Sequence, residues 1–100
     1  NMLYQQGDVL IESVSKLPDD AKKINASPIV LAQGVNTHSI DDVVNCSAYS
    51  GDGLLFLDVK SPVVLSHKEH KPITIETGLY SVRKVREYDH FEEEIRDVED

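Results

Sequence analysis

The sequence predicts a single, mostly β domain over residues 1–100: a β-sandwich or small barrel of about seven to eight short strands, with a short C-terminal helix. A chain of 100 residues suffices for one domain with one modest core. Aromatic residues are few and Trp is absent, so the core must consist of Val, Ile and Leu, which favour strands. Short apolar runs also alternate with turn residues about every 8–12 positions, a spacing typical of sandwiches and barrels.

The alternation of apolar runs and turn residues predicts the following elements. A first strand is expected over residues 3–14, with a bend or bulge at Gly7. Residues 17–24 predict a turn and one helical turn that begins near Pro18. Residues 50–53 predict a hairpin turn, because paired glycines supply the positive φ angles that such turns need. The remaining strands are expected at 29–32, 37–40, 43–49, 54–59, 63–66, 73–75 and 79–88.

The C-terminal end differs in pattern and in charge. Phe91, Ile95 and Val98 fall at i, i+4 and i+7, which predicts an amphipathic helix. Asp89 is a suitable N-cap for it, with a glutamate three residues on. Residues 89–100 hold seven acids against one arginine, so they carry −6 of the net charge of −8. We therefore expect an acidic helix or tail, which disfavours nucleic acid as a partner.

The sequence also indicates where the protein resides. No apolar run approaches 18 residues, so no membrane span is expected, and no secretory leader is visible. Cys46 is the only cysteine and cannot form an internal disulfide, which fits a reducing compartment. We expect a cytoplasmic protein in which Cys46 is a buried strand residue.

Four residues are candidate metal ligands: His38, His67, Glu69 and His70. Imidazole and carboxylate groups bind divalent transition metals such as zinc or iron, and three of these residues lie within a span of four. His38, after a turn, is the natural additional ligand. The alternative is a surface turn whose histidines hydrogen-bond to the backbone, with two neighbouring lysines disfavouring a cation. The sequence leaves both readings open.

A second candidate is an interaction strand that mixes basic and aromatic side chains, a mixture that can bind single-stranded nucleic acid. Its residues are Tyr80, Arg83, Lys84, Arg86 and Tyr88. Because the adjacent tail is acidic, internal ion pairing is the favoured alternative. No phosphate-binding loop, zinc-type cysteine pair or serine elbow is present, so the sequence favours a role other than enzyme.

The order of several short motifs resembles a family of small uncharacterised proteins found in bacteria, phages and other mobile elements. The motifs are Gly7-Asp-Val-Leu10, Leu31-Ala-x-Gly34, Thr37-His38, His67-x-Glu69-His70-x-Pro72-Ile73, Gly78-x-Tyr80-x-Val82 and Arg86-Glu-Tyr88. The resemblance spans about residues 3–98 and implies a shared fold and a mobile-element context. Members with Gly-His-x-His after the threonine faintly resemble a cupin's first motif, but here Thr37 precedes His38-Ser39-Ile40.

Three functions follow as hypotheses. The first is a binding or accessory module of a mobile element that acts through contacts with a protein partner. The second is a metal-binding domain, with or without catalysis, that uses the histidine and glutamate side chains. The third is an acidic nucleic-acid mimic or inhibitor. An exposed β-edge also makes a homodimer a reasonable expectation.

Overall fold

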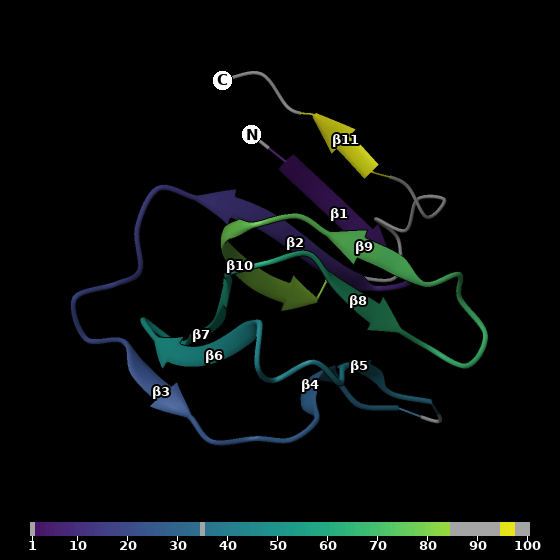
Figure 1. The fold of residues 1–100 in the computed structure, drawn as a ribbon, viewed down its shortest axis with the longest axis horizontal. Coiled ribbons are helices and arrows are strands. Elements are labelled where there is room, and N and C mark those ends of the chain that lie inside the picture. The colour runs from purple at the N-terminus through teal and green to yellow at the C-terminus, as the bar shows by residue number, and fades with distance from the viewer. Residues whose placement is uncertain (1, 35, 85–94, 98–100) are drawn as a thin grey trace.

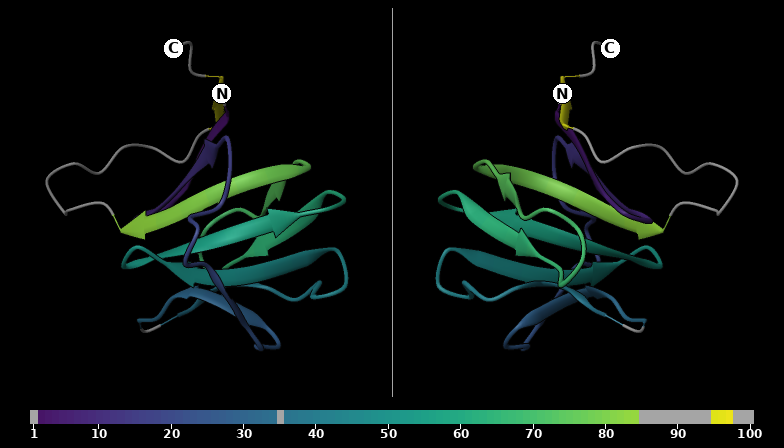
Figure 2. Two further views of the ribbon diagram at one scale, coloured as in Figure 1. Left: turned by 90° about the vertical axis from the view of Figure 1, so that its left-hand side faces the viewer. Right: turned by 90° about the vertical axis from the view of Figure 1, so that its right-hand side faces the viewer.

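The structure is a computed structural model that describes residues 2–34 and 36–84, together with the backbone of residues 95–97. These residues form two antiparallel sheets that pack as two layers (Figures 1 and 2). Neither sheet closes on itself. The mostly β prediction is therefore confirmed, and the barrel alternative is wrong. None of the described residues forms a helix that could cross a membrane.

The larger sheet has seven strands, which are β1 (Met2–Gln6), β2 (Val9–Val14), β3 (Lys22–Ile24), β6 (Cys46–Gly51), β7 (Leu54–Val59), β10 (Gly78–Lys84) and β11 (Ile95–Asp97). Their order across the sheet is β11-β1-β2-β10-β7-β6-β3. The smaller sheet consists of β4 (Ile29–Ala32), β5 (His38–Ile40), β8 (Val63–Ser66) and β9 (Ile73–Ile75), in the order β4-β5-β8-β9. The sequence predicted fewer strands because it merged β1 with β2 and did not predict β3 or β11.

The first predicted strand is in fact a hairpin. Gln6 pairs with Val9, so Gly7 and Asp8 form a two-residue loop between β1 and β2. Gly7 has a φ of 58°, which an L-residue adopts only at a cost. The glycine therefore reverses the chain instead of merely bending it, and this reversal places the Gly7–Asp8 turn at one end of the sandwich.

The hairpin turn predicted at residues 50–53 is confirmed. Gly51 pairs with Leu54, and the two residues between them, Asp52 and Gly53, have φ angles of 52° and 75°. Two consecutive positive φ angles are typical of the primed turns that match the twist of hairpin strands. Residues 17–24 contain the expected turn, closed by a bond from Ala21 N to Pro18 O, but they continue as strand β3.

The predicted C-terminal helix is not supported. Ile95–Asp97 form strand β11, which pairs antiparallel with Met2–Tyr4 of β1. An isolated short helix is marginally stable in water, whereas the edge of β1 offers unpaired backbone groups to a neighbouring strand. Residues 89–94 and 98–100 of the predicted helix lie outside the described residues.

The core lies between the two sheets and contains side chains of both. Its fully buried members include Ile11 and Leu57 from the larger sheet and Ile40 and Leu65 from the smaller one. The rest of this cluster is Tyr4, Val9, Ile29, Cys46, Ala48, Val59, Val63, Ile73, Ile75, Tyr80 and Val82. Aliphatic residues dominate it, as the composition predicted. Buried and exposed side chains alternate most clearly along β8 and β9 of the smaller sheet.

Candidate functional site: a histidine cluster at the Gly7–Asp8 turn

Three segments far apart in the sequence meet at one end of the sandwich. They are the β1–β2 turn, the first residue of β5 (His38), and the β8–β9 loop that holds His67 and His70. The ring centroids of His38 and His67 lie 4.3 Å apart, those of His67 and His70 4.6 Å, and those of His38 and His70 5.7 Å. The structure thus brings the three histidines together, while their role as metal ligands stays a prediction.

Gln6 connects the histidine cluster to the hairpin and to the β8–β9 loop through hydrogen bonds. It shares the inner face of the hairpin with Tyr4, and its side chain is fully buried. Its Nε2 donates hydrogen bonds to the carbonyl oxygens of Leu65 (3.1 Å) and Lys71 (2.7 Å), which flank the β8–β9 loop. Its Oε1 lies 2.8 Å from Nδ1 of His38. One amide thus joins the hairpin, the loop and the first histidine.

His38 is the buried histidine of the cluster, with 5% of its surface exposed. Its Nε2 lies 3.5 Å from Oδ1 of Asp8, while the other oxygen of Asp8 lies 3.6 Å from Nζ of Lys84. Burial lowers the pKa of His38 below the ordinary value of 6.5, and the charges of His67, His70 and Lys84 act in the same direction. Asp8 opposes this shift without overcoming it. His38 is therefore neutral at pH 7.

The side chains of His67 and Glu69 form hydrogen bonds with the β8–β9 loop and with the β4–β5 connection. Nδ1 of His67 accepts hydrogen bonds from the backbone N–H groups of Glu69 (3.1 Å) and His70 (3.2 Å). A carboxylate oxygen of Glu69 accepts a bond of 3.1 Å from the side-chain amide of Asn36. For His67, the backbone-bonding alternative that the sequence allowed is the one observed. Glu69 points to the β4–β5 connection, so the structure does not place it among the three rings.

Gly7 lets the turn approach the rings closely. A Cβ atom on Gly7 would lie 2.8 Å from Nε2 of His70 and 3.2 Å from Cε1 of His38. Both separations are shorter than ordinary van der Waals contact. Glycine is thus required here for its φ angle and also for space, and His70 Nε2 is placed directly beside the turn that carries Asp8.

The described residues contain no group of three His, Cys, Asp or Glu side chains arranged to hold a metal ion. The metal site predicted from the sequence therefore stays a prediction. Sequence analysis missed Gln6 and Asp8. Asp8 belongs to the Gly7-Asp-Val-Leu10 motif but was not taken as a site residue. The signal for Gln6 was the alternation of the hairpin, which places it on the buried face together with Tyr4.

The predicted interaction strand is divided between the core and the surface. Tyr80 is buried and packs edge-on against Tyr4, with ring centroids 5.8 Å apart. Arg83 is exposed and forms an ion pair with Glu12 (3.2 Å), and Lys84 pairs with Asp8. The expected pairing with the acidic tail involves side chains outside the described residues, so it stays a prediction. Arg86 and Tyr88 lie outside the described residues.

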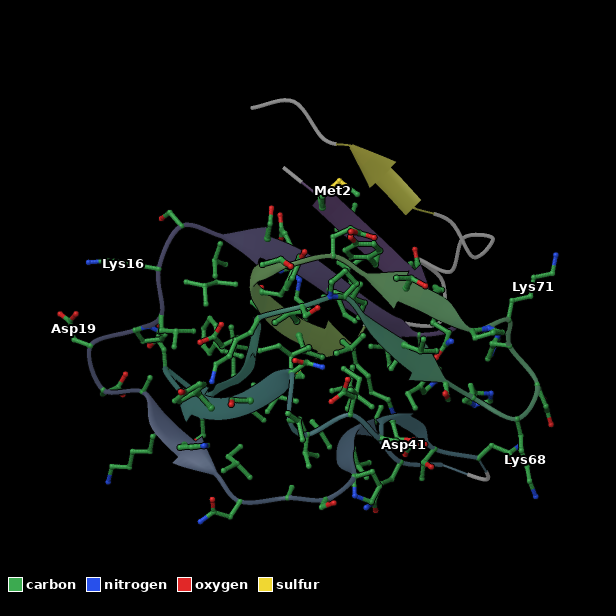
Figure 3. The ribbon with its side chains drawn as sticks, viewed as in Figure 1. Met2, Lys16, Asp19, Asp41, Lys68 and Lys71 are labelled. Atoms are coloured by element: carbon green, nitrogen blue, oxygen red, sulfur yellow. The ribbon has the colours of Figure 1, made fainter. Side chains whose placement is uncertain are left out.

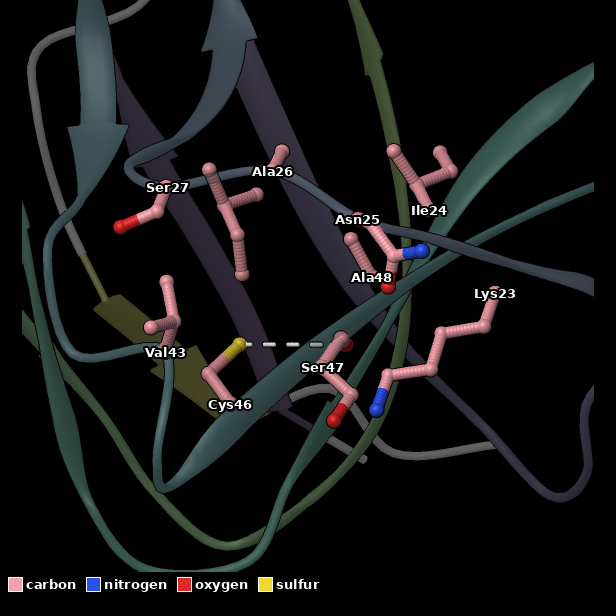
Figure 4. A pocket seen from close by; sticks show the side chains of 10 residues that line it. Lys23, Ile24, Asn25, Ala26, Ser27, Val43, Cys46, Ser47 and Ala48 are labelled. Carbon is pink, nitrogen blue, oxygen red and sulfur yellow. Dashed lines mark hydrogen bonds between the residues drawn. The ribbon is translucent and has the colours of Figure 1, made fainter.

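A separate cavity of ≈ 400 Å³ lies between the β3–β4 connection and β6 (Figure 4). Cys46 lines it and is buried, as predicted. Burial, with smaller contributions from Asp58 and Asp42, raises the pKa of the Cys46 thiol to about 11. The thiol is thus protonated at neutral pH and is a poor nucleophile, because the thiolate is the reactive form.

No curated protein and no solved structure matches this chain. One family model does match, over residues 5–85, and it covers all the described residues of the histidine cluster, from Gln6 to Lys84. Because the match covers most of the chain, it establishes family membership. The chain belongs to the family described as Domain of unknown function (DUF8820).

Proposed function

We propose that this domain is a binding module whose histidine cluster takes one divalent transition-metal ion, held first by His38 Nε2 and Asp8 Oδ1. The 3.5 Å separation of these two atoms is the observation that supports the proposal. With metal–ligand bonds of about 2.0–2.2 Å, two ligands of a tetrahedral ion lie about 3.4 Å apart. The nitrogen and the oxygen are therefore spaced as two corners of one coordination sphere.

The protonation state of His38 also favours a metal ion. Metal binding needs a neutral imidazole, and the burial that lowers the pKa of His38 supplies it at pH 7. Lys84 lies beside Oδ2 of Asp8, on the oxygen that does not face His38. The side chains of Lys68 and Lys71, which lie in the β8–β9 loop, extend outward from the fold (Figure 3). Their charges are thus directed into solvent.

His70 is the third donor in this proposal, through a rotation that turns its Nε2 from its place beside Gly7 toward the metal. Two imidazoles and one carboxylate form a donor set that suits zinc or iron and leaves coordination positions for water or another ligand. Glu69 is left out, because it bonds to Asn36. The proposed ligands are therefore Asp8, His38 and His70.

Metal titration of protein purified without a histidine tag tests the proposal. We expect one equivalent of Zn²⁺ or Co²⁺ to bind, with Co²⁺ giving an absorption spectrum typical of nitrogen and oxygen ligands. Asp8→Asn and His38→Asn should each weaken binding at least tenfold. Asp58→Asn is the matched control, because Asp58 lies on β7, outside the cluster, and it should bind like the natural chain.

Two results would refute metal binding at this site. One is a natural chain that binds neither Zn²⁺ nor Co²⁺ at millimolar concentration. The other is binding that Asp8→Asn and His38→Asn leave unchanged, which would place the ion elsewhere. Circular dichroism of each variant separates lost ligands from a lost fold.

A second candidate function is the accessory module that binds a protein partner, and the turn after β5 supports it. Val44 is 81% exposed, and Asp42 fixes its backbone by accepting bonds from Val44 N (3.1 Å) and Asn45 N (3.0 Å). Val43, the preceding residue, is also exposed (37%), and neighbouring exposed apolar residues mark contact sites more often than single ones do. Val44→Asp should abolish co-purification of a partner, whereas Val64→Asp, at a 47% exposed position on β8, should retain it. Equal loss in both variants would refute a role for this turn.

The mobile-element context and the cytoplasmic location stay predictions from the sequence. The nucleic-acid mimic also stays a prediction, because most of residues 89–100 lie outside the described residues. Its test is removal of that segment, which should abolish binding to a basic partner while the β-sandwich persists.

A further inference from the structure

We infer that Gln6 is the positioning residue of the histidine cluster: it fixes the proton of neutral His38 on Nδ1 and leaves Nε2 as the only nitrogen of that ring able to bind a ligand. The inference deepens the proposed function and rests on it for its purpose. Its evidence is the hydrogen-bond geometry of Gln6, which is independent of any metal.

The orientation of the Gln6 amide follows from its partners. Nε2 of Gln6 lies within hydrogen-bond distance of two carbonyl oxygens, those of Leu65 and Lys71. Carbonyl oxygens only accept, so the NH₂ end must face them, and both of its hydrogens are used. The amide oxygen is then the atom that faces His38 at 2.8 Å. Because an amide oxygen also only accepts, Nδ1 of His38 must carry the hydrogen.

His67 has the opposite proton arrangement. Its Nδ1 accepts two backbone N–H groups, so this nitrogen carries no hydrogen. A neutral His67 therefore carries its hydrogen on Nε2, and its one lone pair is used by the loop. Since a metal binds an unprotonated nitrogen, His67 is not a ligand, although its ring lies closer to His38 than that of His70 does. The pair of histidines in the sequence motif thus divides into one structural residue and one candidate ligand.

Gln6 also sets the direction in which the His38 ring points. An imidazole that binds a metal commonly donates its other N–H to a carbonyl or carboxylate group, which fixes the ring and its proton. Gln6 supplies that acceptor, and it is held by backbone carbonyls at both ends of the β8–β9 loop. The same side chain therefore couples the position of the loop to the orientation of His38.

Nitrogen NMR of the imidazole side chains in metal-free protein tests the inference. The natural chain should show His38 protonated on Nδ1 and His67 protonated on Nε2. Gln6→Glu loses both donors to the loop carbonyls but keeps an acceptor for His38, so in the folded variant His38 should keep a proton on Nδ1. Gln6→Leu removes the acceptor, so His38 should shift toward a mixture of the two forms. Gln5→Leu is the matched control, because Gln5 is the adjacent buried glutamine and, among the described residues, its side chain bonds to Gly7 O and not to His38, so the variant should leave His38 unchanged.

Zn²⁺ titration of the same proteins adds the second readout. Gln6→Leu should bind about 10–100-fold more weakly, as expected on loss of such a partner, and Gln6→Glu should stay within about tenfold of the natural chain. A purely structural role for Gln6 would leave the proton of His38 in place in every folded variant, which would overturn the inference. If Gln6→Leu does not fold, the natural chain still decides: His38 protonated on Nε2 refutes the inference. If the proton positions are as expected but no metal binds, the proposed function fails and the positioning role stands.

Discussion

Replacing Gly7 with Ala tests whether the close packing of the β1–β2 turn on the histidines is real. The substitution has two separable effects. Gly7 has a φ of 58°, so any L-residue is strained there, and the new methyl group would also lie 2.8 Å from His70 Nε2. Gly53 provides the matched control, because its φ is 75° but a Cβ there would meet nothing within 4 Å.

Both variants strain the backbone, but only Gly7→Ala also crowds the histidines. A left-handed backbone costs an alanine about 1–2 kcal/mol, and both variants incur that cost. Gly7→Ala incurs an additional cost of about 1 kcal/mol for overpacking. This addition is small because His70 meets the methyl group with the far end of its ring, which can swing aside. His38 cannot move as readily, since Gln6 holds it by a bond of 2.8 Å.

Urea unfolding followed by circular dichroism measures both variants. We expect Gly7→Ala to lose about 1 kcal/mol more free energy of unfolding than Gly53→Ala, with displaced ring resonances of His70 in Gly7→Ala alone. Equal stabilities and unchanged histidine resonances would show that the turn does not press on the cluster, and would remove the argument that His70 lies beside Asp8.

Three further outcomes are expected from residues outside the cluster. Gly78→Ala should destabilise the fold by about 1–3 kcal/mol in the same assay, because its Cβ would lie 3.2 Å from the Tyr80 hydroxyl that bonds to the preceding turn; an unchanged midpoint would contradict the contact. The thiol of Cys46 has a raised pKa in the folded protein, so stability should fall as pH rises from 9.0 toward about 11, by roughly 2–3 kcal/mol, and a Cys46→Ala variant should lack that slope. Arg83→Ala should change the free energy of unfolding by less than about 1 kcal/mol, since its ion pair with Glu12 is exposed, and a larger loss would reveal a buried role.

The β class could be predicted from the sequence because its signals are local. Val, Ile and Leu in short runs and the Asp52–Gly53 turn each act within a few residues. The hairpin at Gly7 was missed because a strand with an internal glycine and a two-residue turn have almost the same local pattern. Only the pairing of Gln6 with Val9 separates them, and such pairing is set by the rest of the sheet.

The C-terminal helix failed as a prediction for a related reason. The i, i+4, i+7 pattern of residues 91–98 describes a helix that would bury one edge on a partner surface. The chain instead finds backbone partners along β1, with Ile95 opposite Tyr4. A free strand edge is a property of the assembled sheet, so no periodicity within residues 91–98 could reveal it.

The spacing of residues in the histidine motif predicted the site only in part. Two histidines and a glutamate within four residues predict shared ligands, yet each performs a different task here. His67 caps its own turn, Glu69 bonds to Asn36, and only His70 is directed to the β1–β2 turn. The groups that contact both nitrogens of His38 are Gln6 and Asp8. They come from a segment some sixty residues earlier that matches no ligand motif. A buried glutamine that satisfies two loop carbonyls and still offers its oxygen to an imidazole has one consistent hydrogen assignment. That assignment, more than the motif, is what makes His38 Nε2 and Asp8 a testable pair of ligands.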